Sequence, residues 1–260
     1  MSTNSFFDIT RLKYLLIRQL SFNYKANLIA TGVIVGIMIF SGTMMLLFSD
    51  QIMTQQIFLG MIMPYFFIGG YIYSSLIFSE LNSPNKGYLF LTLPASTFEK
   101  LLSAWLSTSV FYILFISIIM YVLNFYFWAI ATSFTSKTVE AMNLFSPGVL
   151  KVFGVYVITQ SIFLLGSIYF RKVHFLKTIL ALFVIAFIVA IFSGIMARIL
   201  FSPTSFQNMS WMNNMNFDHS FDFKYTAEHV IVPIAKVLFW GCTAPFFLVV
   251  SYFRLKEREV

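Results

Sequence analysis

Long apolar runs alternate with short polar segments along the whole chain. A helix needs about 20 mostly apolar residues to cross the hydrocarbon core of a bilayer. Six runs reach this length, and they occupy residues 28–48, 57–78, 105–131, 152–170, 179–200 and 230–253. The third is longer than an upright span requires, so we expect it to tilt or to extend into water. The pattern predicts an all-α polytopic membrane protein with six transmembrane helices in a single domain, residues 1–260.

A different pattern precedes the first run, in residues 6–25. The apolar positions that fall on one helical face are Ile9, Leu12, Leu16 and Leu20. Arg11, Arg18 and Lys25 recur every seven residues on roughly the opposite face. This segregation predicts an N-terminal interfacial amphipathic helix with its basic face towards lipid headgroups. The simpler alternative is a cytoplasmic extension of the first span.

Charge is scarce and unevenly placed. Charged residues make up 10% of the chain, against about 25% in soluble domains. Twelve Lys and Arg residues fall on the side of the two termini, namely Arg11, Lys13, Arg18, Lys25, Lys86, Lys100, Arg171, Lys172, Lys177, Arg254, Lys256 and Arg258. The opposite side has only four, namely Lys137, Lys151, Arg198 and Lys224. This asymmetry predicts a multi-pass membrane protein with both termini in the cytoplasm. Nucleic-acid binding is excluded, because the basic residues sit at the ends of apolar runs rather than in one patch.

The predicted spans lack the groups that chemistry would need. The first four contain no Asp, Glu, His, Lys or Arg in their interiors, whereas intramembrane charges are normally kept for function. No phosphate-binding loop, nucleophile elbow or metalloprotease motif is present. The sequence therefore predicts neither an enzyme nor a cofactor, and any transport would take its energy from a partner. Gly32, Gly36 and the pair Gly69–Gly70 are interpreted as helix-packing positions.

The predicted outer loop, residues 202–229, is the longest polar segment. Its titratable residues and methionines are Met212, Met215, Asp218, His219, Asp222, Glu228 and His229. Met and His can bind copper, but this spacing matches no established metal site. Solvated loop polarity explains the same residues, so we expect no metal here.

The stretch "LTLPASTFEKLLSAWL", residues 91–106, joins the second and third spans. Pro94 ends an extended segment, and either Ser96 or Thr97 can cap a new helix. With Ser96 as the cap, Glu99 completes a capping box and meets the positive helix end. The sequence predicts a short capped helix on the cytoplasmic face that leads into the third span. Capping alone is equally compatible with an ordinary start of that span.

These features together resemble the permease subunits of type-2 ABC transporters, in particular the short Bacteroidota-type permeases. The motifs that carry the resemblance are "TLPASTFEKLLSAWL", "GSIYFRKVHFLKT" and the tail "SYFRLKEREV". The resemblance implies that the segment between the second and third spans is a coupling helix whose exposed side chains dock on a cytoplasmic ABC ATPase subunit. Carried onto this chain, its residues would be Leu93, Pro94, Ala95, Ser96, Thr97, Glu99 and Lys100. It also implies a homodimer, or a heterodimer with a second permease, in the bacterial inner (cytoplasmic) membrane.

Two functions remain open from the sequence. The first is the permease subunit of an ATP-driven transporter, which we expect to be an exporter. The second is a membrane anchor or assembly protein that transports nothing and recruits cytoplasmic partners through its loops. A membrane-embedded enzyme is the weakest alternative, because the spans offer no acid–base groups.

Overall fold

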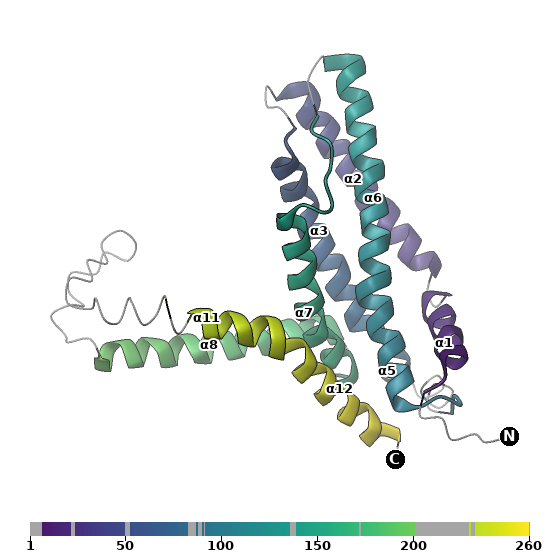
Figure 1. Cartoon of the computed structure of the whole chain (residues 1–260), viewed down its shortest axis with the longest axis vertical. Coiled ribbons are helices and arrows are strands. Elements are labelled where there is room, and N and C mark those ends of the chain that lie inside the picture. The colour runs from purple at the N-terminus through teal and green to yellow at the C-terminus, as the bar shows by residue number, and fades with distance from the viewer. Residues whose placement is uncertain are drawn as a thin grey trace.

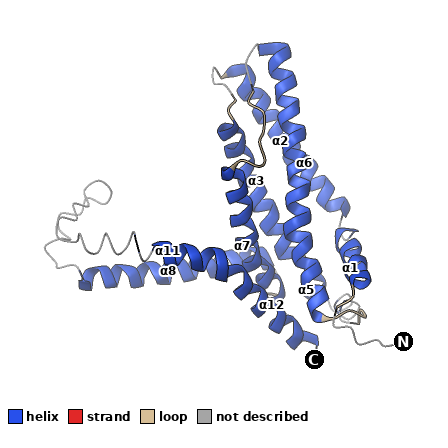
Figure 2. Cartoon of the chain, viewed as in Figure 1, coloured by secondary structure: helices blue, strands red, loops and turns tan. Residues whose placement is uncertain are grey.

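The computed structural model describes residues 7–21, 24–49, 53–82, 87, 90, 92–135, 139–171, 173–200, 229 and 232–259. Helices make up nearly all of this part of the chain (Figure 2), and the described residues contain no strand. The first half comprises α1 (Ile9–Ser21), α2 (Tyr24–Phe48), α3 (Gln55–Leu76), the 3-10 helix η1 (Ser79–Asn82), α5 (Thr97–Leu106) and the π-helix η2 (Ser107–Phe111). The second half comprises α6 (Tyr112–Ile130), the π-helix η3 (Ala131–Thr135), α7 (Pro147–Tyr169), α8 (His174–Leu200), α11 (Val232–Val237), the π-helix η5 (Leu238–Cys242) and α12 (Thr243–Glu259).

Six helical segments are long and apolar enough to cross a membrane, which confirms the predicted number of spans. They run over Asn27–Phe48, Gln55–Leu81, Thr97–Phe134, Pro147–Tyr169, His174–Met196 and Val232–Arg258. The third differs most from its predicted bounds of 105–131, because α5, η2, α6 and η3 follow one another without a break. The predicted outer loop 202–229 lies outside the described residues, apart from His229.

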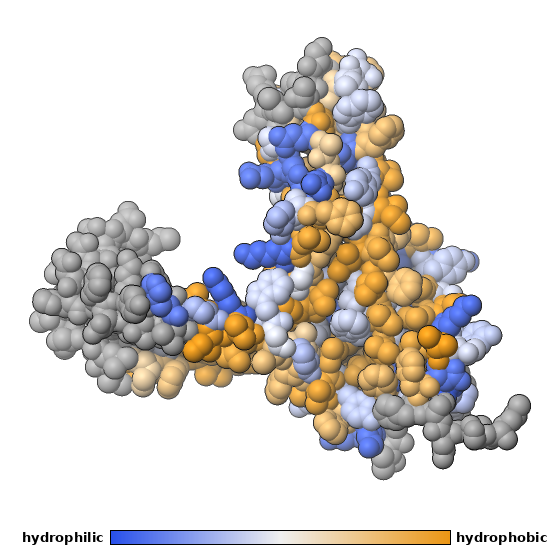
Figure 3. Space-filling model, viewed as in Figure 1, coloured by the Kyte–Doolittle hydropathy of each residue, from blue (hydrophilic) through white to orange (hydrophobic). Residues whose placement is uncertain are grey.

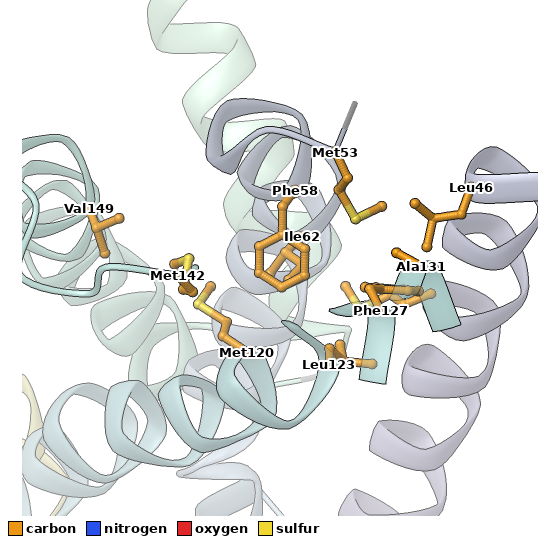
Figure 4. Packing of buried hydrophobic residues seen from close by; sticks show 11 residues of the cluster. Leu46, Met53, Phe58, Ile62, Met120, Leu123, Phe127, Ala131, Met142 and Val149 are labelled. Carbon is orange, nitrogen blue, oxygen red and sulfur yellow. The ribbon is translucent and has the colours of Figure 1, made fainter. Parts of the chain in front are cut away.

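An upright bundle contains α2, α3, α6 and α7, and both chain ends lie at the same end of it (Figure 1). At the opposite end of the bundle the four helices enclose an apolar cluster (Figure 4) that includes Leu46, Phe58, Phe127 and Val149. Phe127 packs directly against Gly42, where an added Cβ would collide with its ring. Lipid is as apolar as these side chains, so close packing and van der Waals contact hold such helices together.

A second apolar cluster lies towards the end that carries the termini. It brings together Phe78 and Phe90 with Leu101 of α5, Leu164 of α7 and Leu255 of α12, all nearly or fully buried. The start of α5 is therefore packed into the fold. The bundle surface between the two ends is largely apolar (Figure 3), as expected for helices that face lipid.

The helix α8 leaves this bundle. Its first turns contact α7 and α3, with His174 and Thr178 buried, and the rest extends to one side (Figure 1). Beyond the contact, side chains such as Phe183 and Phe187 are more than half exposed.

The glycines that the sequence assigned to helix packing divide into two kinds. Gly70 contacts Tyr156, which confirms its predicted packing role. Around Gly32 and Gly36, by contrast, the described residues place no atom within 4 Å of an added Cβ, apart from the adjoining backbone of α2 itself.

Candidate functional site

The start of α5 has the predicted capping box. The Glu99 backbone N–H donates to Ser96 Oγ at 3.2 Å, and the Ser96 N–H donates to Glu99 Oε2 at 2.8 Å. Ser96 is therefore the N-cap, and Thr97, the alternative cap, is the first residue of the helix. Pro94 precedes the cap within a tight turn in which the Ala95 N–H donates to the Leu93 carbonyl oxygen at 2.7 Å.

The carboxylate of Glu99 also serves a second helix. Its Oε1 accepts the backbone N–H of Asp8 at 2.6 Å, and Arg11 Nη2 lies 3.4 Å from the same oxygen. Asp8 is placed as the cap of α1, because its Oδ1 accepts the Thr10 N–H at 2.8 Å and its carbonyl accepts from Leu12. The buried carboxylate of Glu99 thus accepts hydrogen bonds from the backbone N–H groups of the cap residues of two helices. Both positive helix ends favour a negative charge at this point.

This double cap anchors α1 in an orientation that the sequence did not predict. Arg11 turns towards Glu99, and Arg18 Nη2 forms an ion pair with Glu80 Oε2 at 2.6 Å. The side chains of α1 that are buried are Leu12, Leu15 and Gln19, whereas Ile9 is 73% exposed. The helix is therefore rotated relative to the predicted apolar face. Of the predicted basic face, Arg11 and Arg18 contact carboxylates of this chain, while Lys25 is exposed and lies 6.0 Å from the centre of the Tyr24 ring.

Burial divides the predicted coupling residues. Glu99 and Lys100 are 0% and 2% exposed, and Lys100 Nζ lies 5.6 Å from the centre of the Phe90 ring. Neither can belong to an exposed docking surface, because both are enclosed by α1 and by the second apolar cluster. Partly exposed are Leu93, Ala95, Ser96 and Thr97.

Of the predicted coupling residues, Pro94 is the one that is exposed, and other exposed side chains lie beside it. Thr92, Pro94 and Phe98 face outwards, and Phe98 packs edge-on against Phe7 with ring centroids 6.4 Å apart. We call these four residues, Phe7, Thr92, Pro94 and Phe98, the aromatic knob. The sequence argument did not name Phe98 as a coupling residue. Its position between Thr97 and Glu99, in the first turn of the predicted helix, could have identified it.

The helix continues from α5 into α6 through a π-turn. In η2, Thr108 Oγ1 donates to the Ala104 carbonyl at 2.9 Å and Ser109 Oγ donates to that of Trp105 at 2.5 Å. Ser107 Oγ donates to Gln19 Oε1 of α1 at 3.1 Å. The π-turn contains an additional residue, and such insertions are frequent at functional positions of helices.

A buried polar cluster surrounds this π-turn. Gln160 of α7 is fully buried, and its Oε1 accepts hydrogen bonds from Ser74 of α3 at 3.2 Å and from Thr108 at 3.0 Å. The Tyr156 hydroxyl donates to the Thr108 carbonyl at 2.8 Å. Tyr71 and Thr159 bond through their hydroxyls at 2.7 Å. The sequence argument considered only titratable residues, and so it missed Gln160, whose amide inside an apolar run was a usable signal.

The polar side chains around α5 and η2 hold helices in position. In the described part of the chain, no group of three or more His, Cys, Asp or Glu residues could hold a metal ion. Most members of the predicted outer-loop group lie outside the described residues. The contacts of Glu99 and Gln160 instead connect helices to one another, which suits a part that transmits movement.

Comparison of the chain with protein-family models, with curated proteins and with solved structures finds no match.

Proposed function

We propose that this chain is the permease subunit of an ATP-driven transporter of the ABC-2 type, an exporter in the bacterial cytoplasmic membrane that is energised by a separate ATPase subunit. Its termini, and with them the aromatic knob, would lie in the cytoplasm. The observation that carries the proposal is the construction of α5. An exposed knob sits on a capped, buried helix start, and that helix continues without a break into a membrane-spanning helix.

The contacts of α5 suit it to receive a force. At its start, Glu99 ties it to α1, and Leu101 and Ala104 pack in the cluster that includes α7 and α12. A partner that displaces the aromatic knob therefore moves several helices together instead of bending one loop. The movement would reach the π-turn and the polar cluster around Gln160, where hydrogen bonds can be exchanged between neighbouring hydroxyls.

A dimer is part of the proposal. The cluster that the four helices enclose at one end of the bundle is apolar, and an added Cβ at Gly32 or Gly36 of α2 would meet open space among the described residues. Small residues at this spacing let helices approach closely in a membrane. We propose that a second permease, identical or not, contacts this chain through α2 or α8.

Co-purification tests the proposal directly. The change is Phe98→Ala combined with Phe7→Ala, which removes both aromatic rings of the knob and leaves the capping box intact. Truncating a hot-spot side chain at an interface costs about 2 kcal/mol or more. We expect the two rings to form such a hot spot, so recruitment of the ATPase subunit should fall about thirtyfold or more. The measurement is the amount of ATPase retained by the tagged permease, together with the rate of ATP hydrolysis.

Phe145→Ala is the matched control, because Phe145 is 79% exposed and lies between α6 and α7, away from the knob. It should leave recruitment unchanged. Equal retention by both variants would rule out the coupling role of the knob. Failure of the unaltered chain to retain any ATPase would instead favour the anchor or assembly function.

A further inference from the structure

A cavity of about 460 Å³ opens between the first half of α2 and the helices α3 and α6. It exists because the first turns of α2 stand away from the bundle: Leu28, Ile29 and Val33 are more than half exposed, and Met38 is the first described side chain of α2 that is buried. We call this cavity the α2 groove. Its volume lies within the range of about 300–1,000 Å³ that is typical of small-molecule sites.

The wall of the α2 groove offers hydrocarbon and aromatic surface. Ile34, Ile62, Phe115 and Ile119 are among its lining residues. Three hydroxyls in the wall are already engaged: Thr31 donates to the Asn27 carbonyl at 2.8 Å, Tyr112 to the Phe66 carbonyl at 2.8 Å and Ser107 to Gln19 at 3.1 Å. An occupant deep in the groove therefore gains van der Waals contact and few hydrogen bonds, as an alkyl chain does.

The length and position of the groove match one leaflet of a bilayer. Its lining on α2 runs from Tyr24 to Met38, about 21 Å at 1.5 Å per residue, and one leaflet with its headgroup region is about 20–22 Å thick. Tyr24 and Asn27, in the first turn of α2, line one end of the groove, and this end of α2 lies next to α1 (Figure 1). Lys25 stands beside this mouth, with its ammonium 6.0 Å from the centre of the Tyr24 ring.

We propose that the α2 groove binds one acyl chain of an anionic phospholipid from the leaflet on the side of the termini. The chain lies along α2 between α3 and α6, and the phosphate-bearing headgroup sits at Tyr24 and Asn27 beside the positive charge of Lys25. Aromatic residues at a membrane interface and a nearby cation favour this arrangement over a wholly apolar ligand. The site requires no ATPase and stands apart from the proposed transport function.

Native mass spectrometry of the detergent-purified full chain tests this site. The unaltered protein should retain one phospholipid per chain. Ala30→Phe places a ring in the groove and should reduce retention at least fivefold. Ile29→Phe is the matched control, since Ile29 is adjacent, 69% exposed and not part of the groove, and it should retain lipid normally. Absence of lipid from the unaltered protein, or equal retention by the two variants, would overturn the proposal.

A photoreactive residue gives a second measurement that does not depend on filling the groove. Benzoylphenylalanine replaces Phe115 in the wall of the groove or Phe125, which lies on the outer surface of α6 and is 67% exposed. Irradiation in detergent should add a phospholipid mass at position 115 and not at 125. Cross-linking of a second copy of the chain at 115 would show that another subunit fills the groove, and would overturn the lipid assignment.

The headgroup is tested by competition between phosphatidylglycerol and phosphatidylcholine in nanodiscs. One cation near a membrane surface corresponds to about a fivefold preference for the anionic lipid. The unaltered protein should show this preference, and Lys25→Gln should abolish it without emptying the groove. Equal retention of the two lipids by the unaltered protein would refute the anionic headgroup.

Discussion

The helices α7 and α8 are neighbours in the chain and both qualify as membrane spans, yet they have opposite surroundings. In the apolar window of α7, 39% of the residues are buried, whereas none are in the window of α8. The mean hydropathy runs the other way, 1.8 for α7 and 2.9 for α8. The more apolar helix is thus the less buried one, which reverses the rule for soluble proteins.

The composition of the two helices gives the reason. Where α7 meets its neighbours it carries Thr159, Gln160, Gly166 and Ser167, residues that allow close approach or form hydrogen bonds. The helix α8 presents Phe, Ile and Val around most of its circumference. Lipid competes equally for large apolar side chains, so in a membrane small and polar residues mark the packed helix. Four predictions test this division between packed and exposed positions.

The largest effect is expected at a buried charge. Glu99→Lys would place a cation beside Arg11 and at the positive ends of α1 and α5, where the carboxylate now accepts two amide protons. Breaking a buried charged network typically costs about 3–5 kcal/mol, so the free energy of unfolding in bicelles should fall by that amount. The sequence alone placed Glu99 in the coupling helix, whose exposed side chains were expected to dock on an ATPase, whereas the structure buries this carboxylate.

The control for that variant is Glu257→Lys, because Glu257 is 62% exposed and pairs with Arg254 one turn away. Surface ion pairs are worth about 0–1 kcal/mol, and this reversal should lower the free energy of unfolding by no more than that. Similar losses for the two variants would contradict the buried role of Glu99.

The next effect compares glycines of the two helices. An added Cβ at Gly166 in α7 would collide with the Thr178 side chain, whereas Gly194 in α8 has open space. Gly166→Leu should therefore lower the thermal midpoint in detergent, with an overpacking cost of about 1–3 kcal/mol. Gly194→Leu should leave the midpoint unchanged or raise it, because leucine favours the helix over glycine. A drop at Gly194 would show that α8 is packed against something.

A smaller effect is expected for the buried amide. Gln160→Leu removes the acceptor of Ser74 and Thr108, but each hydroxyl keeps a second acceptor, the carbonyl of Gly70 or Ala104. Hydrogen bonds between membrane helices average about 0.6 kcal/mol and reach about 1.7, so the loss should lie in that range. Ser193→Leu in α8 should cost nothing measurable by the same unfolding titration. Equal losses of unfolding free energy for the two variants would contradict the distinction between a packed α7 and an exposed α8.

The smallest effect is expected when the pH is lowered and Asp8 is protonated. The hydrogen bond from the Thr10 backbone N–H lowers the pKa of Asp8 below its usual value of 3.8. Because the pKa of Asp8 is lower in the folded protein than in the unfolded chain, the charged carboxylate stabilises the fold at pH values above the unfolded pKa. This stabilisation is lost as the pH falls through the folded pKa. Below about pH 4, α1 should therefore loosen, which amide hydrogen exchange in α1 would detect. Asp8→Asn keeps the cap and should remove this acid dependence, while an unchanged acid response would assign it to another group.

The sequence by itself determined the features that depend on short stretches of chain. The six apolar runs, the all-α class and the Ser96–Glu99 capping box follow from hydropathy and from residues within one or two turns, and the structure confirms each. Such signals are readable because insertion into a bilayer and capping of a helix are local events. The coupling role and the orientation of the spans stay predictions.

Only the tertiary structure decided which of these residues meet. Glu99 and Asp8 are 91 positions apart, and nothing near either one indicates that the carboxylate would cap both helices. Contacts between distant parts of the chain also decide the rotation of α1 and the departure of α8 from the bundle. They likewise bring Gln160 against Ser74 and Thr108. Apolar side chains in a membrane fit lipid or protein equally well, so hydropathy identifies a span without choosing its neighbours. That choice rests on where small residues and hydrogen-bonding groups of separate helices coincide in space.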